Sequence, residues 1–291
     1  MLINTGFSSS NIEVKQTDGK RQAELNIVND NQSEFKQWFY FRVSNILDQT
    51  VTLSIANAHD CAYVEGWENY QACCSYDGIE WFRVATEYRD GELIITQHAL
   101  NDSAYFAYFA PYSYERHLQL VDSVALHPLT RVSVIGQTLD NREMHLITVG
   151  EPSAEKKSIW IIARQHPGET MAEWFMEGLI DRLLDADDAV AQSLLERHCF
   201  YLVPNMNPDG SERGHLRTNA IGINLNREWD KATLEKSPEV HCVRQHMEQT
   251  GVDLFLDIHG DEALPYNFLA ANEGIPSYNE QMAEQERHFS G

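Results

Sequence analysis

A change of pattern at Pro111 constrains the fold of this chain more than any other feature. Before Pro111, short runs of alternating apolar and polar residues recur, separated by turn signals such as Asp77-Gly78 and Asp90-Gly91. The six runs are 23–28, 37–43, 51–55, 81–84, 92–95 and 105–109. Runs at a spacing of roughly ten residues, with no helical periodicity between them, predict an antiparallel β-sandwich. We therefore expect residues 1–110 to form an all-β N-terminal domain.

After Pro111 the sequence alternates between helical and strand patterns. The predicted strands are 131–136, 144–149, 158–163, 199–203 and 252–258, and the predicted helices are 112–126, 173–184, 190–197 and 238–250. The run 158–163 is continuously apolar, which is typical of a strand buried on both faces. Strands that alternate with helices predict an α/β domain with a mixed, mostly parallel sheet flanked by helices. We expect this second domain to occupy residues 111–291.

Charge and composition exclude several classes of partner. The 291 residues include 22 Lys and Arg against 44 Asp and Glu, so the net charge is -22. A field of this sign repels nucleic acid and anionic membranes, and we expect neither as a partner. No apolar run approaches the ~18 residues of a membrane helix. The chain has an odd number of cysteines, five, and no secretory signal, which predicts reduced thiols and a cytoplasmic location. The sequence does not indicate the oligomeric state.

Residues with metal-binding chemistry follow two of the predicted strands. His166-Pro167-Gly168-Glu169 comes directly after 158–163, and His259 comes directly after 252–258. Sites in α/β sheets form at the carboxyl ends of strands. The Pro-Gly pair forces a tight turn, so that His166 and Glu169 can face one point. Two imidazoles and one carboxylate suit a hydrolytic Zn²⁺ site with an open fourth position, so we predict one zinc ion held by His166, Glu169 and His259.

Placement supports this site more strongly than spacing does. A His-x-x-Glu pair arises by chance about once in a chain of this composition, and a second pair occurs at His259 and Glu262. We interpret Glu262 as solvent-facing. His241 and His246 are five residues apart on a predicted helix, so they do not share a face, and we expect structural or exposed roles for them.

A third polar segment lies between the two metal-binding segments. Residues 205–210 have the composition of a turn, and Arg217 and Arg227 follow, ten residues apart. Planar guanidinium groups suit the binding of a carboxylate; the alternative is two surface arginines. The sequence contains no Gly-rich dinucleotide loop, Walker-type loop or Gly-x-Ser-x-Gly elbow, which disfavours nucleotide binding and serine hydrolysis.

The order of these motifs resembles a known family. His166-Pro167-Gly168-Glu169, Asn207-Pro208-Asp209-Gly210, Asn226-Arg227-x-Trp229 and His259 occur in the order found in the carboxypeptidase-A-like zinc metallocarboxypeptidases. The segments 38–45, 111–114 and 217–227 are similar to the cytosolic carboxypeptidase subfamily, in its bacterial form. That subfamily carries a β-sandwich ahead of its catalytic domain. The resemblance covers essentially the whole chain.

The resemblance implies a function and residue roles. His166, Glu169 and His259 resemble the zinc ligands, Asn226 and Arg227 the pair that grips the substrate carboxylate, and Arg217 the arginine that polarises the scissile carbonyl. The implied reaction is hydrolysis of the C-terminal peptide bond, or of a glutamyl side-chain bond, of a peptide or protein by a metal-activated water. Asn224 stands where the family often has an Asp that hydrogen-bonds the first histidine, so we expect weaker zinc binding.

The general base of the family has no match in this chain. In the family this residue is a Glu well downstream of the last histidine, and 32 residues follow His259 here. We therefore expect the base beyond Gly291, and a catalytic domain that lacks its C-terminal part. Two alternatives remain open: a related zinc amidohydrolase that acts on N-acyl or γ-glutamyl substrates, and a non-catalytic carboxylate-binding zinc module if the chain truly ends at Gly291.

Overall fold

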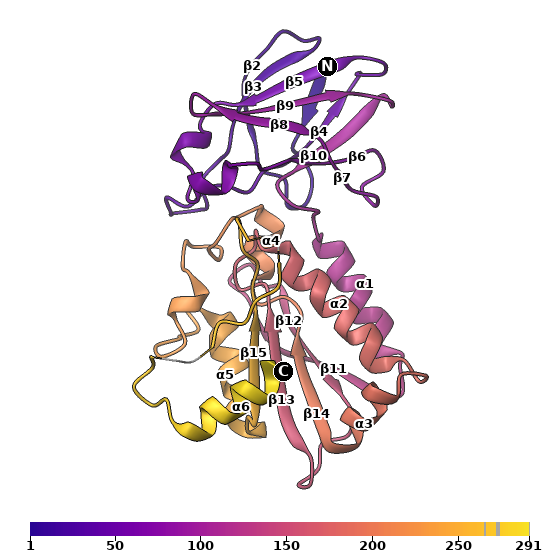
Figure 1. Ribbon diagram of the computed structural model, residues 1–291, viewed down its shortest axis with the longest axis vertical. Helices are drawn as coiled ribbons and strands as arrows, with labels where there is room; N and C mark the ends of the chain where they lie inside the picture. The colour runs from indigo at the N-terminus through magenta and orange to yellow at the C-terminus, as the bar shows by residue number, and fades with distance from the viewer. Residues whose placement is uncertain (265, 272–273, 291) are drawn as a thin grey trace. The chain divides into compact units, whose positions relative to one another are not determined.

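The computed structural model describes residues 1–264, 266–271 and 274–290 (Figure 1). They form two compact units, Met1–Gly260 and Asp261–Gly291; Gly291 itself, the end of the predicted second domain, lies outside the described residues. The second unit contains the helix α6 (Glu280–Ser290). Within the described ranges, no helix is long and apolar enough to cross a membrane.

Two five-stranded sheets form the N-terminal part of the first unit and confirm the predicted all-β fold. One sheet has the order β1 (Leu2–Asn4), β4 (Tyr40–Ser44), β10 (Ser103–Ala107), β6 (Cys73–Ser75) and β7 (Phe82–Arg83). The other has the order β2 (Glu13–Thr17), β3 (Gln22–Asn26), β5 (Thr50–Ile55), β9 (Glu92–His98) and β8 (Ala85–Arg89). The strands pair antiparallel except β3 with β5. Two short 3-10 helices, η1 (Ala58–Asp60) and η2 (Val64–Trp67), follow β5.

The core of this part lies between the two sheets. Alternate residues of β5, namely Val51, Leu53 and Ile55, are fully buried, as the period of two in a strand requires. They join one apolar cluster with residues of the other sheet, such as Phe41 and Phe106. The alternating pattern in the sequence therefore marks the inner faces of the two sheets.

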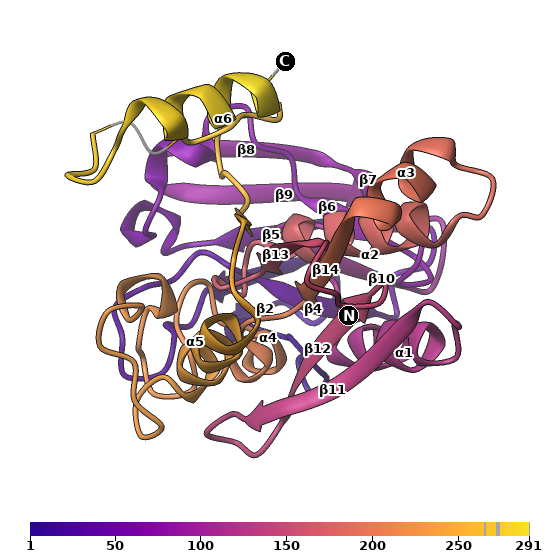
Figure 2. The same ribbon diagram turned by 90° about the horizontal axis from the view of Figure 1, so that it is seen from below.

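A mixed sheet forms the centre of the second part. Its order is β11 (Thr130–Gln137), β12 (Glu143–Val149), β14 (His198–Val203), β13 (Lys157–Ala163) and β15 (Leu254–Ile258). Two of the four pairings are parallel, β14 with β13 and β13 with β15. The helices α1 (Tyr114–Ala125), α2 (Thr170–Leu184) and α3 (Ala189–Arg197) pack on one face, and α5 (Pro238–Thr250) packs on the other (Figures 1 and 2). The predicted α/β class is thus confirmed.

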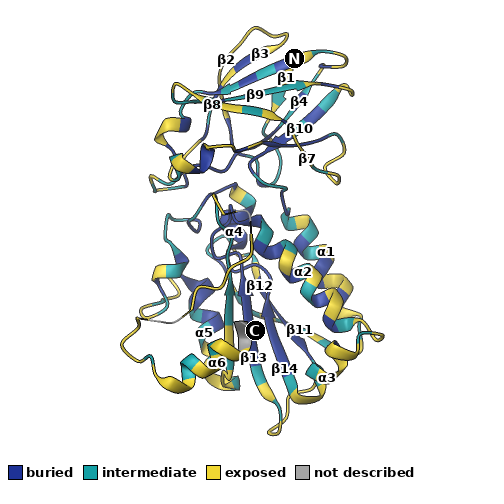
Figure 3. Ribbon diagram, in the orientation of Figure 1, coloured by how far each residue is buried: buried dark blue, intermediate teal, exposed yellow. Residues whose placement is uncertain are grey.

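The strand β13 is covered on both faces, as its apolar run predicts. Ile159 and Ile161 pack with α1 and α2, whereas Trp160 and Ile162 pack with residues of α5. Figure 3 shows the central strands buried and the outer surfaces of the helices exposed. Because both faces of β13 are covered, a site beside this strand can form only at its end, and sites in such sheets form at the carboxyl ends of the strands.

A buried carboxyl group, Glu239, makes the stability of this fold depend on pH. Glu239 lies in the first turn of α5, is fully buried, and receives no well-formed hydrogen bond on either oxygen. Burial raises its pKa to about 8, from an ordinary value of 4.5. The folded chain therefore holds this proton to a higher pH than the unfolded chain does. The stability linked to this group is fully present below pH 4.5 and is lost as the pH rises through 8.

The variant Glu239→Gln is expected to remove this pH dependence. Its melting temperature should be close to that of the parent chain at pH 5 and clearly higher at pH 8, because the amide has no proton to lose. Thermal unfolding of both chains at the two pH values measures the difference. Glu248→Gln, on the exposed surface of the same helix, serves as the control. A difference between parent and Glu239→Gln that is equal at the two pH values would contradict the prediction.

Candidate metal centre

Two neighbouring strands end side by side and deliver the predicted ligands to one place. β13 and β15 run parallel, and Ala163 at the end of one pairs with Ile258 at the end of the other. The chain leaves β13 through a tight turn that carries His166 and Glu169, and α2 begins at the next residue. His259 directly follows β15. Because the ends of the strands are in register, residues distant in sequence meet at the same sheet edge.

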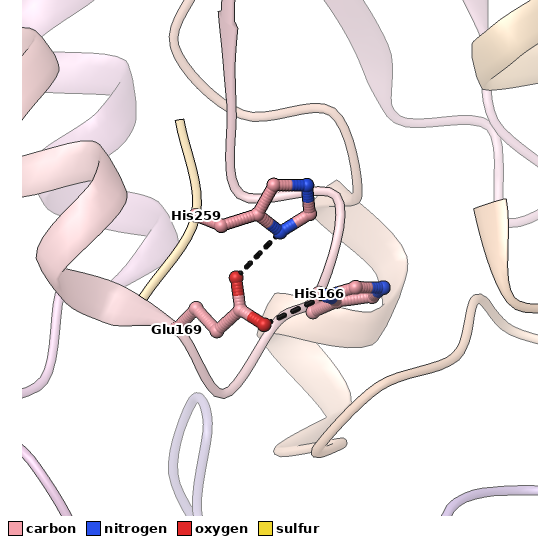
Figure 4. A group of neighbouring side chains, drawn as sticks. All are labelled: His166, Glu169 and His259. Atoms are coloured by element: carbon pink, nitrogen blue, oxygen red, sulfur yellow. Dashed lines mark hydrogen bonds and ion pairs between the residues drawn. The ribbon is translucent and has the colours of Figure 1, made fainter. Parts of the chain in front are cut away.

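The three side chains converge on a common point (Figure 4). One ligand atom from each of His166, Glu169 and His259 lies within 4.8 Å of the others. The Nδ1 atom of His166 lies 2.7 Å from one oxygen of Glu169, and Nδ1 of His259 lies 2.8 Å from the other. His166 and Glu169 are buried and His259 is partly exposed, so the group is open to solvent on the His259 side.

The electrostatics of this group favour a positive charge at its centre. Burial alone would raise the pKa of Glu169, but the hydrogen bonds from His166 and His259 outweigh it and lower that pKa to about 2. Burial alone would lower the pKa of His259, yet its hydrogen bonds with Asp257 and Glu169 raise it to about 10. A carboxylate that stays ionised beside an imidazole that attracts a proton is an environment suited to a cation.

The outward nitrogens of both rings have partners of their own. Nε2 of His166 lies 3.2 Å from Oδ1 of Asn224, and Nε2 of His259 lies 2.8 Å from Oδ2 of Asp257. Metal-binding histidines commonly donate their second N–H to such an oxygen, which fixes the tautomer and the orientation of the ring. With a metal ion in place of the Nδ1 protons, each Nε2–H would donate outward and each Nδ1 lone pair would be directed at the shared point. The donor set and its support therefore fit a zinc ion.

The turn between His166 and Glu169 is held by a buried ion pair. Arg164 has a positive φ of 57° and donates through Nε to the carbonyl oxygen of Pro167 at 3.0 Å. Its guanidinium also lies 2.6 Å from a carboxylate oxygen of Glu173, one helical turn beyond Glu169. Arg164 and Glu173 are both almost fully buried. Their ion pair therefore holds the turn in place from the protein interior.

The predicted substrate-binding residues lie on loops beside this group. Asn226 and Arg227 belong to the short helix η3 (Leu225–Arg227), and Asn224 caps it by accepting from the N–H of Asn226 at 3.1 Å. Nδ2 of Asn226 lies 3.5 Å from Nε2 of His259. Arg227 is exposed, and Arg217 is half-buried. The structure thus brings Asn224 and Asn226 into contact with the two histidines, while Arg217 and Arg227 make no direct contact with the three ligands among the described side chains.

Two polar residues of this site were not predicted from the sequence. Asp257 lies on β15 and accepts from both His259 and the side-chain amide of Gln165. Gln165 is fully buried and accepts in turn from the indole N–H of Trp229 at 2.9 Å. A signal for Asp257 was present, since a residue two positions before His259 points to the same face of a strand. A polar side chain within an otherwise apolar strand sequence indicates a specific partner.

Known protein families match both parts of the chain. The family profile for the cytosolic carboxypeptidase N-terminal domain matches residues 3–109, and the zinc carboxypeptidase profile matches residues 118–289. An uncharacterised protein of Zymomonas mobilis is 51% identical over 289 residues, which are 99% of this chain and 75% of that protein. Cytosolic carboxypeptidase 3 of Bos taurus is 25% identical over 94% of the chain, and the chain spans 31% of its length.

A solved structure extends the likeness to three dimensions. The metallo-carboxypeptidase of Pseudomonas aeruginosa, in complex with (2-guanidinoethylmercapto)succinic acid, is 44% identical and superimposes with a TM-score of 0.96. The match covers 99% of this chain and 77% of that protein. These matches define the class of protein as a metallopeptidase, which is a hydrolase. The chain belongs to the zinc carboxypeptidase family, and it carries the N-terminal domain of the cytosolic carboxypeptidases.

Proposed function

We propose that this chain carries the zinc centre and the substrate-binding groups of a metallocarboxypeptidase. One observation supports this above all: ligand atoms of His166, Glu169 and His259 lie within 4.8 Å of one another. Each imidazole also turns its other nitrogen toward an outer acceptor, Asn224 or Asp257. Two nitrogens and a carboxylate with oriented rings are the donor set of catalytic zinc sites.

Different residues of the chain would bind the substrate and polarise its scissile carbonyl group. A zinc ion at this site would polarise the substrate carbonyl and lower the pKa of its water. Arg217 would donate to the carbonyl oxygen as negative charge develops there. Asn226 and Arg227 would bind the terminal carboxylate, which limits cleavage to the last residue and fixes its orientation. We assign no residue of this chain to proton transfer.

The charge balance of the two arginines supports their roles. The chain has twice as many acids as bases, yet neither Arg217 nor Arg227 has a carboxylate within ion-pair distance among the side chains that the structure describes. Arg217 instead contacts Tyr63, and Arg227 donates to a backbone carbonyl. Two guanidinium groups that remain available in an acidic chain suit a substrate with a free carboxylate. The proposed substrate is therefore the C-terminus of a peptide or protein, or a glutamyl side chain.

Metal analysis and a substrate panel test this function. After zinc loading and removal of free metal, elemental analysis should find one zinc per chain. The panel pairs peptides of varied C-terminal residue with N-acyl and γ-glutamyl amino acids. Release of C-terminal residues supports the proposal, and exclusive cleavage of the acyl or γ-glutamyl substrates would assign an amidohydrolase instead. The name of the bovine relative leads us to propose a cytoplasmic location for this chain as well.

The ligand of the Pseudomonas aeruginosa relative provides a binding test that is independent of turnover. (2-Guanidinoethylmercapto)succinic acid has two carboxylates, and we expect one to meet Arg227 in the zinc-loaded chain. Arg227→Ala should weaken its binding about 10- to 100-fold, because hydrogen bonds to charged groups contribute ~1.5–3 kcal/mol. Titration calorimetry measures the affinity. Arg197→Ala, an exposed arginine on α3, is the control, and equal affinities for the two variants would refute the clamp.

A further inference from the structure

A buried carboxylate of the N-terminal β part, Asp30, receives four hydrogen bonds from the loop that carries Arg217. Asp30 is 2% exposed and belongs to the segment of chain that connects β3 to β4. Oδ1 accepts from the N–H of Leu216 at 2.6 Å. Oδ2 accepts from the N–H groups of Arg217 and Thr218 at 2.8 and 2.9 Å, and from the hydroxyl of Thr218 at 3.0 Å. Asp30 therefore fixes the backbone on both sides of Arg217.

The same loop contacts the turn that carries the predicted zinc ligands. The carbonyl oxygen of Leu216 accepts from the N–H of Gly168 at 2.9 Å. Gly168 lies between His166 and Glu169, and a Cβ at this position would stand only 3.0 Å from that oxygen. The loop is thus bound on one side to Asp30 and on the other to the metal-binding turn. Through these contacts the position of Arg217 relative to the turn is set by a residue 187 positions earlier.

The guanidinium of Arg217 is placed by a second residue of the β part. Its Nη1 donates to the hydroxyl of Tyr63 at 2.5 Å, and its Cζ lies 5.6 Å from the ring centroid of Phe35 and 6.0 Å from that of Tyr63. Tyr63 is held in turn by the fully buried Gln37. The N–H of Tyr63 donates to Oε1 of Gln37 at 2.7 Å, and its carbonyl oxygen accepts from Nε2 at 3.0 Å. The guanidinium therefore has a defined direction as well as a defined backbone.

We propose that Asp30 and Tyr63 are positioning residues for Arg217, and that the N-terminal β part in this way completes the active site. This inference rests on the proposed function. Arg217 has a long side chain, and holding it in one orientation costs conformational entropy. A donor aligned in advance stabilises developing charge better than a mobile one does. Asp30 aligns the backbone, and Tyr63 with Phe35 aligns the guanidinium.

Asp30→Asn tests the inference with little change of shape. The variant loses the charge and one of the two acceptor oxygens that the donors require. We expect the second carboxylate of (2-guanidinoethylmercapto)succinic acid to meet Arg217. The affinity of the zinc-loaded chain for this probe, measured by calorimetry, should therefore fall about tenfold. Zinc content should stay at one per chain. Asp18→Asn is the matched control, because the exposed Asp18 accepts from three backbone N–H groups within its own turn, and its affinity should stay within about twofold of the parent.

A double-variant cycle separates positioning from a general effect on folding. In an Arg217→Ala background, Asp30→Asn should not weaken the binding of the probe any further, because the effect of Asp30 acts through Arg217. An equal loss in both backgrounds would overturn the inference, as would an Asp30→Asn chain that binds the probe like the parent. If Asp30→Asn does not fold, Tyr63→Phe takes its place in the same cycle. We expect Tyr63→Phe to weaken the binding of the probe about threefold in the parent background. Absence of zinc from the parent chain would refute the proposed zinc centre itself. If the parent binds zinc but Arg217→Ala binds the probe like the parent, the role of Arg217 and this inference are refuted, and the zinc centre is not.

Discussion

Replacing His166 with alanine is expected to lower the affinity of the chain for Zn²⁺ by more than about 100-fold. Residues that only orient a ligand from outside contribute about 10- to 100-fold to metal affinity, and His166 is one of the three proposed direct donors. Its Nδ1 lies at the shared point beside Glu169, and no other His, Cys, Asp or Glu in the described ranges joins the group. Competition with a chromogenic chelator measures the affinity, and elemental analysis measures the zinc content.

Two companion variants make this expectation specific. Asn224→Ala removes the acceptor of the His166 ring, so it should cost about 10- to 100-fold, less than the loss of the ring itself. Glu262→Gln alters the second His-x-x-Glu pair of the sequence and should leave the affinity unchanged. The assignment would be wrong if His166→Ala binds zinc like the parent, or if Glu262→Gln loses it.

Zinc should also stabilise the parent chain and not His166→Ala. A ligand that binds only the folded state adds about 4 kcal/mol when its concentration is a thousand times its dissociation constant. Excess zinc should therefore raise the melting temperature of the parent. In His166→Ala the same addition should have little effect, because the weakened site is not saturated. Equal shifts for both chains would show that zinc binds elsewhere.

The strands that carry the site could be predicted because their signals are local. The apolar run before His166 is a strand covered on both faces, and the Pro-Gly turn follows it closely in sequence. The run before His259 is a partly exposed strand at the side of the sheet. Parallel neighbours that end in register then bring the ligands together. Two short stretches of chain, each interpreted alone, thus predict the strands that carry the site.

Other elements could not be predicted because their sequence signals conflict with their structure. The strand β2 has five exposed residues and no alternation, so its pairing with β3 alone defines it. The segment from Asn207 has the composition of a turn, yet it begins the helix α4 (Pro208–Arg213). Asn207 accepts from the N–H of Gly210 at 3.0 Å, and Pro208 occupies the first helical position, as both residues commonly do at helix starts.

The support of the site was the least predictable part, since it comes from residues far away in sequence. Asp30 and Tyr63 precede Arg217 by 187 and 154 positions, and nothing near either residue in the sequence indicates a partner. The geometry of such contacts depends on how the two parts of the first unit pack. Motifs therefore predict candidate groups for the chemistry, whereas the residues that hold these groups in place can be found only in the folded chain.

Replacing Glu173 with alanine is expected to destabilise the fold by about 3–5 kcal/mol, the usual cost of removing one partner of a buried ion pair. Glu173 is fully buried in α2 and faces two groups that are almost as buried. One of its oxygens lies 2.7 Å from Nδ1 of His117 on α1, and the other 2.6 Å from the guanidinium of Arg164. The second oxygen also accepts from the side chain of Asn205 at 3.1 Å. Without the carboxylate, the charge of Arg164 stays in the interior with no ionised partner.

Glu177, one turn further along α2, provides the matched control. It also accepts from an arginine, Arg116, but that pair is partly exposed, and such pairs contribute about 0–1 kcal/mol. Chemical denaturation followed by tryptophan fluorescence should rank the costs as Glu173→Ala, then Glu173→Gln, then Glu177→Ala, because the amide keeps the volume and part of the hydrogen bonding. Equal costs for the two alanine variants would mean that the buried pair is not required. Because Arg164 also holds the carbonyl of Pro167, Glu173→Ala should loosen the turn and weaken zinc binding, which the chelator assay detects independently of stability.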